Sequence, residues 1–581
     1  MKFLAVVLAL TGLQVVRTAA QTVLREHIWS TVIYSREGDR TPYILPTSNT
    51  LTPLGATQMY SAGTRFRERY LVSASGNGNT LIQGVSPFQL DNDQVSVVSL
   101  NDQFIVASAQ AFMQGLYPPL MAYSNATFIN GQSQLANGSN ILSPLEGYQY
   151  PKISAVSPFD FNSIWLMGDN NCPMYSASRS EYFNSAFYDH LLETNQEFYR
   201  SLQPALLNGI FANSSVNYLN AYLIFDYLNY GSVHNSSFLD DLSFEDLTRA
   251  KILADHWVLA MYGNTSVSGL TEGDRIRAIA GRTLAYEIVT ALYGNINTAG
   301  TRQKMTLLFG GFQPMVSFAA LASLASEHNP QFLGIPEYGS SMVFELFSLT
   351  EGDTDIYPAT ADLNVRFFFQ NGTDDTSDLV AYPLFGNGPS GISMTLSEFV
   401  ADMQNIMVSS VVDWCQTCAS YSIFCPAFEA DAGDGRSAPT HPRSRGGLRP
   451  VVAGVIGAVV TLAVFGLLIA AAAVFGGVRL YRQRTKKRSE LNGFKGGEKL
   501  ASDQDLTIPK SGASASIVVA GEGPTRGHER VGSWELGDQK KAEEAQRPGL
   551  NSSATVIRRP SFEDDLHVSP FADPVKPNDR V

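Results

Sequence analysis

The sequence is poor in charged residues, in histidine and in cysteine. Of its 581 residues, 16% are Asp, Glu, Lys or Arg, eight are histidine and four are cysteine. Basic residues are fewer than acidic ones, 41 against 54, and the formal net charge is −13. Because nucleic-acid binding requires a basic surface, this deficit excludes a nucleic acid as the expected partner. The 44% of hydrophobic residues are enough for a large core.

The histidines are scattered and form no cluster with carboxylates or cysteines. We therefore predict neither a metal site nor a cofactor. They stand at His27, His190, His234, His256, His328, His441, His528 and His567.

The four cysteines all precede the longest apolar run of the chain. They are Cys172, Cys415, Cys418 and Cys425. A Cys-x-x-Cys pair alone is a weak zinc signal, since zinc needs a closed set of ligands, and an even number in an oxidising compartment favours two disulfides. Three pairings are possible, and the sequence leaves them open.

Two apolar runs indicate a secreted, membrane-anchored chain. Residues 1–20 are typical of a signal peptide, with Lys2, an apolar stretch and small residues at the end. Residues 451–478 carry no charge and exceed the roughly 20 residues that a membrane-spanning helix needs. Together they predict a single-pass type I protein of the cell surface or the secretory or vacuolar pathway. A buried core helix is the alternative for the second run.

The segments on either side of residues 451–478 agree with this topology. Residues 427–450 are rich in Gly, Pro, Ser and Arg, which predicts a stalk, and residues 479–581 are polar and predict a disordered cytosolic tail whose partner is unknown. Ser561 follows two arginines and a proline, like a kinase site, although such motifs often occur by chance. Candidate N-glycosylation sites lie on the outer side at Asn125, Asn137, Asn213, Asn235, Asn264 and Asn371.

Residues 31–42 are the most informative stretch before the predicted membrane span. A β-branched apolar run ends in Arg36, Glu37, Gly38 and Arg40 and then Pro42, which predicts a strand that runs into a tight loop. Ligands bind at the carboxyl ends of strands in open α/β sheets. Two guanidinium groups at such a place suit a phosphate or carboxylate, so a phosphorylated or other anionic ligand is possible.

This stretch resembles the signature of the histidine acid phosphatases, the family that includes phytases: Arg-His-Gly-x-Arg-x-Pro. Arg36, Gly38, Arg40 and Pro42 match, and the resemblance continues through residues 51–67 as the following helix. In that family the histidine is the nucleophile and becomes phosphorylated. Here Glu37 occupies its position.

The resemblance implies further losses. The family has a phosphate-binding arginine four residues before the serine that matches Ser108, and this chain has Phe104 there. After the strand expected at residues 305–309, the family has His-Asp, which binds phosphate and protonates the leaving group. Gly311 and Phe312 stand at these positions. Residues 307–322 contain no His, Asp or Glu, so a shift of the alignment by a few residues would still leave the chain without this His-Asp pair.

The expected fold is α/β, a mixed open sheet flanked by helices with an inserted helical domain. The resemblance implies an ectodomain at residues 21–426, with a sheet domain at 21–118 and 295–426 and a helical insertion at 119–294. Aromatic residues in the insertion, such as Tyr222, are expected to be core rather than a binding stripe.

Two functions remain open. The first is a catalytically impaired surface protein that binds a ligand or partner, and the second is an active acid phosphatase with a rearranged site. Arg36 and Arg40 are the remnant of the phosphate site, and we expect Glu37 either to fill it from within or to point to solvent.

Overall fold

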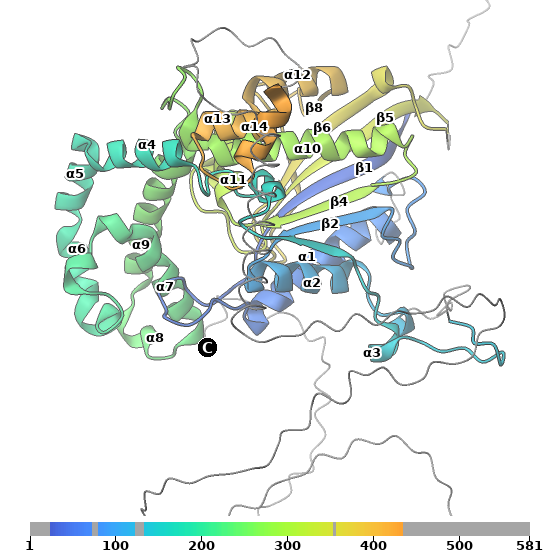
Figure 1. Cartoon of the computed structure of the whole chain (residues 1–581). Coiled ribbons are helices and arrows are strands. Elements are labelled where there is room, and N and C mark those ends of the chain that lie inside the picture. The colour runs from blue at the N-terminus through green and yellow to red at the C-terminus, as the bar shows by residue number, and fades with distance from the viewer. Residues whose placement is uncertain (1–23, 73–79, 123–132, 353–355, 434–581) are drawn as a thin grey trace, which may run out of the picture. The chain divides into compact units, whose positions relative to one another are not determined.

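The computed structural model describes residues 24–72, 80–122, 133–352 and 356–433. The expected signal peptide, the membrane span at 451–478, the tail with Ser561 and the sequon at Asn125 lie outside these residues. Within the described ranges, no helix is long and apolar enough to cross a membrane. Figure 1 shows the chain coloured from the amino to the carboxyl terminus.

The core of the described part is an eight-stranded sheet. The expectation of a mixed sheet flanked by helices is confirmed. The strand order is β3-β2-β4-β1-β5-β6-β7, and β8 pairs with β6. Strands β3, β2, β4 and β1 are parallel, and β5 to β8 join antiparallel. The strands are β1 (Leu24–Arg36), β2 (Val95–Leu100), β3 (Ile153–Val156), β4 (Met305–Gly310), β5 (Ser341–Glu351), β6 (Leu363–Gln370), β7 (Val380–Tyr382) and β8 (Ser393–Thr395).

Strand β1 lies inside the sheet and is buried along most of its length. Its β-branched and aromatic side chains suit a strand that is covered on both faces. In the register with β4, Arg36 pairs with Gly310. The loops that follow β1 and β4 therefore begin side by side, and this places the two halves of the candidate site together.

Helices cover both faces of the sheet (Figure 1). α1 and α2 lie on one face, and α10 and α12 lie on the other, with α11 packed against α10. The flanking helices are α1 (Pro53–Arg67), α2 (Gln103–Leu116), α10 (Ile279–Asn297), α11 (Gln313–Leu321) and α12 (Leu396–Ile406).

The helical insertion is smaller than the predicted range of 119–294. Residues 153–156 form β3 and pair with β2, and α10 packs against β1, so both belong to the sheet layer. A four-residue edge strand such as β3 gives almost no periodic signal, and the helical period of α10 does not show which layer the helix packs against. The helices that remain in the insertion form a separate aromatic-rich core: α4 (Pro173–Phe183), α5 (Ala186–Thr194), α6 (Gln196–Leu202), α7 (Ala221–His234), α8 (Phe238–Asp241) and α9 (Phe244–Val258).

The end of the ectodomain was also predicted too early. Helix α14 (Cys425–Gly433) continues past residue 426, through the first residues of the expected stalk. Phe428 of this helix packs edge-on against Phe161, with ring centroids 5.1 Å apart. This apolar contact extends the folded part beyond the point at which the composition changes.

Two disulfides are present, and this prediction is confirmed. Cys172 pairs with Cys418, and Cys415 pairs with Cys425. Cys172 precedes α4, whereas Cys415 and Cys418 lie on α13 (Val411–Cys418). The Cys172–Cys418 disulfide therefore joins the helical insertion to a helix whose cysteine comes 246 residues later in sequence.

Candidate functional site

The loop after β1 rests on the amino terminus of α1. Thr52 caps this helix by accepting a hydrogen bond from the Gly55 amide, and Pro53 is its first residue. A Cβ atom on Gly38 would lie 2.4 Å from the Gly55 carbonyl oxygen, and one on Gly55 would lie 2.1 Å from that of Asp39. The signature glycine is therefore required by a close approach of two backbones.

Glu37 is buried between the two arginines, with only 1% of its surface exposed. One carboxylate oxygen, Oε1, lies 3.3 Å from Nε of Arg40 and 3.8 Å from Nε of Arg36. The second oxygen has no hydrogen-bond partner among the described residues. The alternative in which Glu37 points to solvent is therefore wrong, and that Glu37 fills an anion site stays a prediction.

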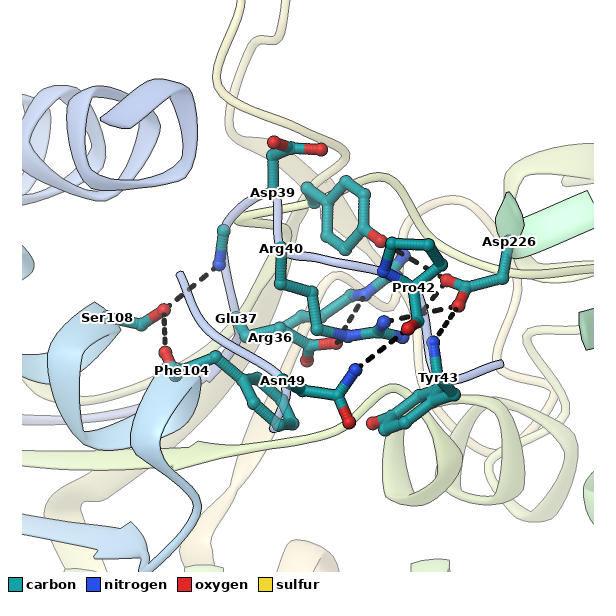
Figure 2. Close-up of polar contacts among 12 residues, drawn as sticks. Arg36, Glu37, Asp39, Arg40, Pro42, Tyr43, Asn49, Phe104, Ser108 and Asp226 are labelled. Carbon is teal, nitrogen blue, oxygen red and sulfur yellow. Dashed lines mark hydrogen bonds and ion pairs between the residues drawn. The ribbon is translucent and has the colours of Figure 1, made fainter. Parts of the chain in front are cut away.

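Arg40 is held by a second carboxylate, which comes from the helical insertion (Figure 2). Asp226 of α7 accepts two hydrogen bonds from the Arg40 guanidinium, at 3.2 and 3.1 Å. Tyr222 accepts a further one at 3.1 Å, and the backbone amide of Tyr43 donates to Asp226 at 2.9 Å. Arg40 is 0% exposed, so the insertion covers this side of the site.

Arg36 is enclosed mainly by aromatic rings and a backbone carbonyl. Its guanidinium carbon lies 4.1 Å from the ring centre of Tyr338 and 5.4 Å from that of Phe312. Nη1 donates a hydrogen bond to the carbonyl of Pro336, whereas Nε has no hydrogen-bond partner within the described part of the chain. The Nε–H group of Arg36 therefore lacks a hydrogen-bond acceptor among the described residues, and the nearest carboxylate oxygen is that of Glu37 at 3.8 Å.

Two of the positions that the resemblance singles out, Phe104 and Phe312, lie beside the arginines. Phe104, in the first turn of α2, lies with its ring 5.4 Å from the guanidinium carbon of Arg40. Phe312 follows β4 and is 2% exposed, and the Gly311 carbonyl accepts a hydrogen bond from the Tyr34 hydroxyl at 2.7 Å. Ser108 accepts a hydrogen bond from the Gly38 amide at 3.1 Å. Aromatic rings therefore lie beside both guanidinium groups.

Several residues of the site were missed by the sequence analysis. Asp226, Tyr222 and Tyr338 surround the arginines, and Tyr222 is more than the core residue that was expected. In the segment of α7, Asp226 is the one carboxylate in a run of apolar and aromatic residues. A carboxylate in such a run needs a buried cation, and this signal could have pointed to Arg40.

A second contact joins the loop to α7. His234, at the end of this helix, lies with Nε2 2.7 Å from a carboxylate oxygen of Asp39, which also accepts a hydrogen bond from the Thr52 hydroxyl. The backbone amide of Asp39 also donates a hydrogen bond to Oε1 of Gln58, a residue of α1, at 2.8 Å. The insertion is thus attached to the loop at two separate points.

The charges within the site are closely balanced. Burial by itself lowers the pKa of Arg36, but Glu37, Tyr338 and Tyr222 together outweigh this effect, and the pKa of Arg36 is raised. Burial likewise opposes the charge of Arg40, and Tyr338, Tyr43 and Asp226 outweigh it, so that its pKa is also raised. Both guanidinium groups therefore remain cationic and are neutralised by protein groups.

The remaining predicted sites are distributed over the surface. Asn137, Asn213 and Asn235 are exposed, whereas Asn264 and Asn371 are half-buried. Across the described ranges, no group of three or more His, Cys, Asp and Glu side chains is arranged to hold a metal ion.

The comparisons with known proteins point to one family. A family model described as the histidine phosphatase superfamily (branch 2) matches residues 18–369. No curated protein matches the chain.

Among solved structures, the phytase from Citrobacter braakii is 14% identical, with a TM-score of 0.42, over 66% of this chain and 98% of that chain. The phytase from D. castellii is 14% identical, with a TM-score of 0.39, over 72% and 87%. The multiple inositol polyphosphate phosphatase from Bifidobacterium longum is 13% identical, with a TM-score of 0.37, over 66% and 93%.

Proposed function

We propose that this chain, which belongs to the histidine phosphatase superfamily (branch 2), is a catalytically impaired member that acts as a membrane-anchored binding protein. The observation that carries the proposal is Glu37, which is 1% exposed and lies against both arginines at the nucleophile position. The resemblance assigns a histidine nucleophile to this position.

Hydrolysis of a phosphomonoester needs a nucleophile, an acid for the leaving group, and cations around the phosphoryl oxygens. Glu37, Gly311 and Phe312 replace the residues that the resemblance assigns to the first two roles. Loss of one transition-state donor alone costs about 10²–10³ in rate. The replacements therefore support very low activity.

Glu37 is also poorly suited to act as a phosphoryl acceptor. Its carboxylate would have to attack a phosphate dianion, and the two arginines that could offset the repulsion already contact Glu37 and Asp226. A phosphate that enters must therefore compete with two protein carboxylates for the same guanidinium groups. This competition argues against turnover at this site.

Activity is tested with the purified full-length chain in detergent, with p-nitrophenyl phosphate as substrate between about pH 3 and pH 7. The control is the double variant Arg36→Ala, Arg40→Ala. We expect equal rates from both proteins. Turnover of about one per second or more, a modest rate for an enzyme, that disappears in the double variant would establish the active-phosphatase alternative instead.

The membrane anchor is part of the proposal and is supported by the sequence alone. The uncharged run at 451–478 and the signal-like start favour a single-pass protein with its amino terminus outside. Protease added to intact cells should remove an epitope placed before residue 427 and spare one at the carboxyl terminus. The reverse pattern would invert the orientation.

A further inference from the structure

A separate cavity lies against helix α10, away from the two arginines. Its volume is ≈ 520 Å³, within the range of about 300–1,000 Å³ that is usual for small-molecule sites. Val98 of β2 and Val156 of β3 form part of its wall, and residues of α13 and α14 complete it. None of the residues that surround Arg36 and Arg40 belongs to its lining.

One carboxyl group faces this cavity without a partner. Glu287 of α10 lines it and forms no hydrogen bond or ion pair with any described residue, and burial alone raises the pKa of its carboxyl to about 7. The described lining contains no Lys, Arg or His, and its one other ionisable group is Tyr286. A half-buried carboxylate without a cation is costly, since neither water nor protein compensates its charge fully.

Aromatic rings stand on the cavity wall next to this carboxyl group. Trp165 stacks on Tyr286 with centroids 4.3 Å apart, and Phe161 contacts Phe428 edge-on at 5.1 Å. All four side chains line the cavity. Ring faces attract cations, and rings also bury apolar groups. The cavity therefore combines an aromatic wall with one carboxyl group, which is mostly negatively charged only above about pH 7.

We propose that this cavity binds an organic monocation, a protonated amine on an aromatic or branched apolar body, with the ammonium group on Glu287. The amine supplies the hydrogen-bond donors that the carboxylate lacks, and the rings of Trp165 and Phe428 bury the body of the ligand. This site is independent of the proposed loss of phosphatase activity, because it shares no residue with the arginine site.

Other ligand classes fit the same walls less well. An organic anion is repelled by Glu287, and a neutral apolar molecule leaves the carboxyl group unpaired. Calcium requires about six to eight oxygen ligands, and the described lining offers one carboxylate among mostly apolar groups. The single charge and the apolar volume thus select a monocation.

Binding should carry a protonation signature. Because the carboxyl group of Glu287 is half-protonated near pH 7 in the free chain, an ammonium that requires the carboxylate expels a proton. Tyr286 is the one other titratable group among the described residues that line the cavity. Affinity for an amine should therefore rise from pH 5.5 to pH 7.5.

The test is isothermal titration of the full-length chain with 2-phenylethylamine, and with 2-phenylethanol as the neutral match. A charge-assisted hydrogen bond favours the amine by about 10- to 100-fold. Titration in two buffers of different ionisation enthalpy should show proton release at pH 6.5. Glu287→Gln, which preserves the shape, should abolish both the preference and the proton release, whereas Glu193→Gln on the exposed surface of α5 should preserve them.

Thr290→Trp provides a second variant that leaves Glu287 in place. Thr290 is exposed and lines the cavity, so an indole there should block entry without disturbing the fold, and binding of the amine should be lost. The proposal is overturned if neither probe binds, if the amine and the alcohol bind equally, or if the Glu287→Gln variant keeps the preference. Unchanged binding to the Thr290→Trp variant would place the ligand outside this cavity and would also overturn it.

Discussion

Replacement of Glu37 by alanine should turn the closed arginine site into an anion-binding site. In the native chain, two guanidinium groups face two carboxylates, those of Glu37 and Asp226, and the group of four is neutral. Glu37→Ala leaves one positive charge in excess at a place that is almost inaccessible to water. It also removes the side-chain volume that an incoming anion would need. Glu37→Gln removes the charge alone.

The size of the effect follows from the contacts. Removal of one partner of a buried ion pair costs about 3–5 kcal/mol. The distances of 3.3 and 3.8 Å from Glu37 Oε1 to the two Nε atoms are longer than the about 2.7–2.9 Å of a strong charged hydrogen bond. We therefore expect the low end, about 3 kcal/mol, which lowers the melting temperature by about 6 °C at about 2 °C per kcal/mol.

Phosphate should reverse most of this loss. At a concentration 100 times its dissociation constant, a ligand of the folded state stabilises by about 2.7 kcal/mol. The assay is thermal unfolding of the full-length chain in phosphate and in chloride at equal ionic strength. Phosphate should raise the melting temperature of the Glu37→Ala variant by about 5 °C. It should raise that of the Glu37→Gln variant less, because the amide still fills the space, and it should leave the native chain and the Glu193→Ala variant unchanged.

Equal responses of the native chain and the Glu37→Ala variant to phosphate would refute the reasoning. That result would mean that Glu37 does not keep anions out. Loss of stability without rescue by phosphate would also count against it, because it would show that the vacated site does not accept an oxyanion.

Three further predictions concern stability. Asp226→Asn should cost about 3–5 kcal/mol in urea unfolding, since it breaks the paired hydrogen bonds to Arg40; a cost below 1 kcal/mol would mean that the pair is solvated. The carboxyl of Glu287 has a pKa of about 7 in the folded chain against 4.5 as its ordinary value, so its contribution to stability is present below pH 4.5 and lost as the pH rises to 7. Glu287→Gln should thus stabilise by up to about 3 kcal/mol at pH 8 and by little at pH 4, as melting curves at both pH values can show. The Cys172→Ser, Cys418→Ser double variant removes a disulfide that closes a loop of 246 residues. Because this disulfide restricts the unfolded chain, its loss should lower the free energy of unfolding by about 5 kcal/mol in guanidinium; an unchanged midpoint would contradict this reasoning.

The sequence was sufficient wherever the information is local. The β-branched run before Arg36 predicts a strand, and the pattern of Gly38, Arg40 and Pro42 predicts the loop that carries the arginines. The substitutions at Phe104 and Phe312 could be located by comparison with one motif each. Such features depend on neighbours within a few residues, so they can be read without knowledge of the fold.

Contacts between segments that are distant in sequence were decided only by the tertiary structure. The pairing of Asp226 with Arg40 spans 186 residues, and the choice between three disulfide pairings depends on where α13 packs. The place of β3 in the sheet and the cavity at Glu287 likewise arise from several elements that meet in space. Pattern and propensity fix which side chains are buried, but packing alone fixes which buried charges find a partner. Among the described residues Glu37 finds one, and Glu287 does not.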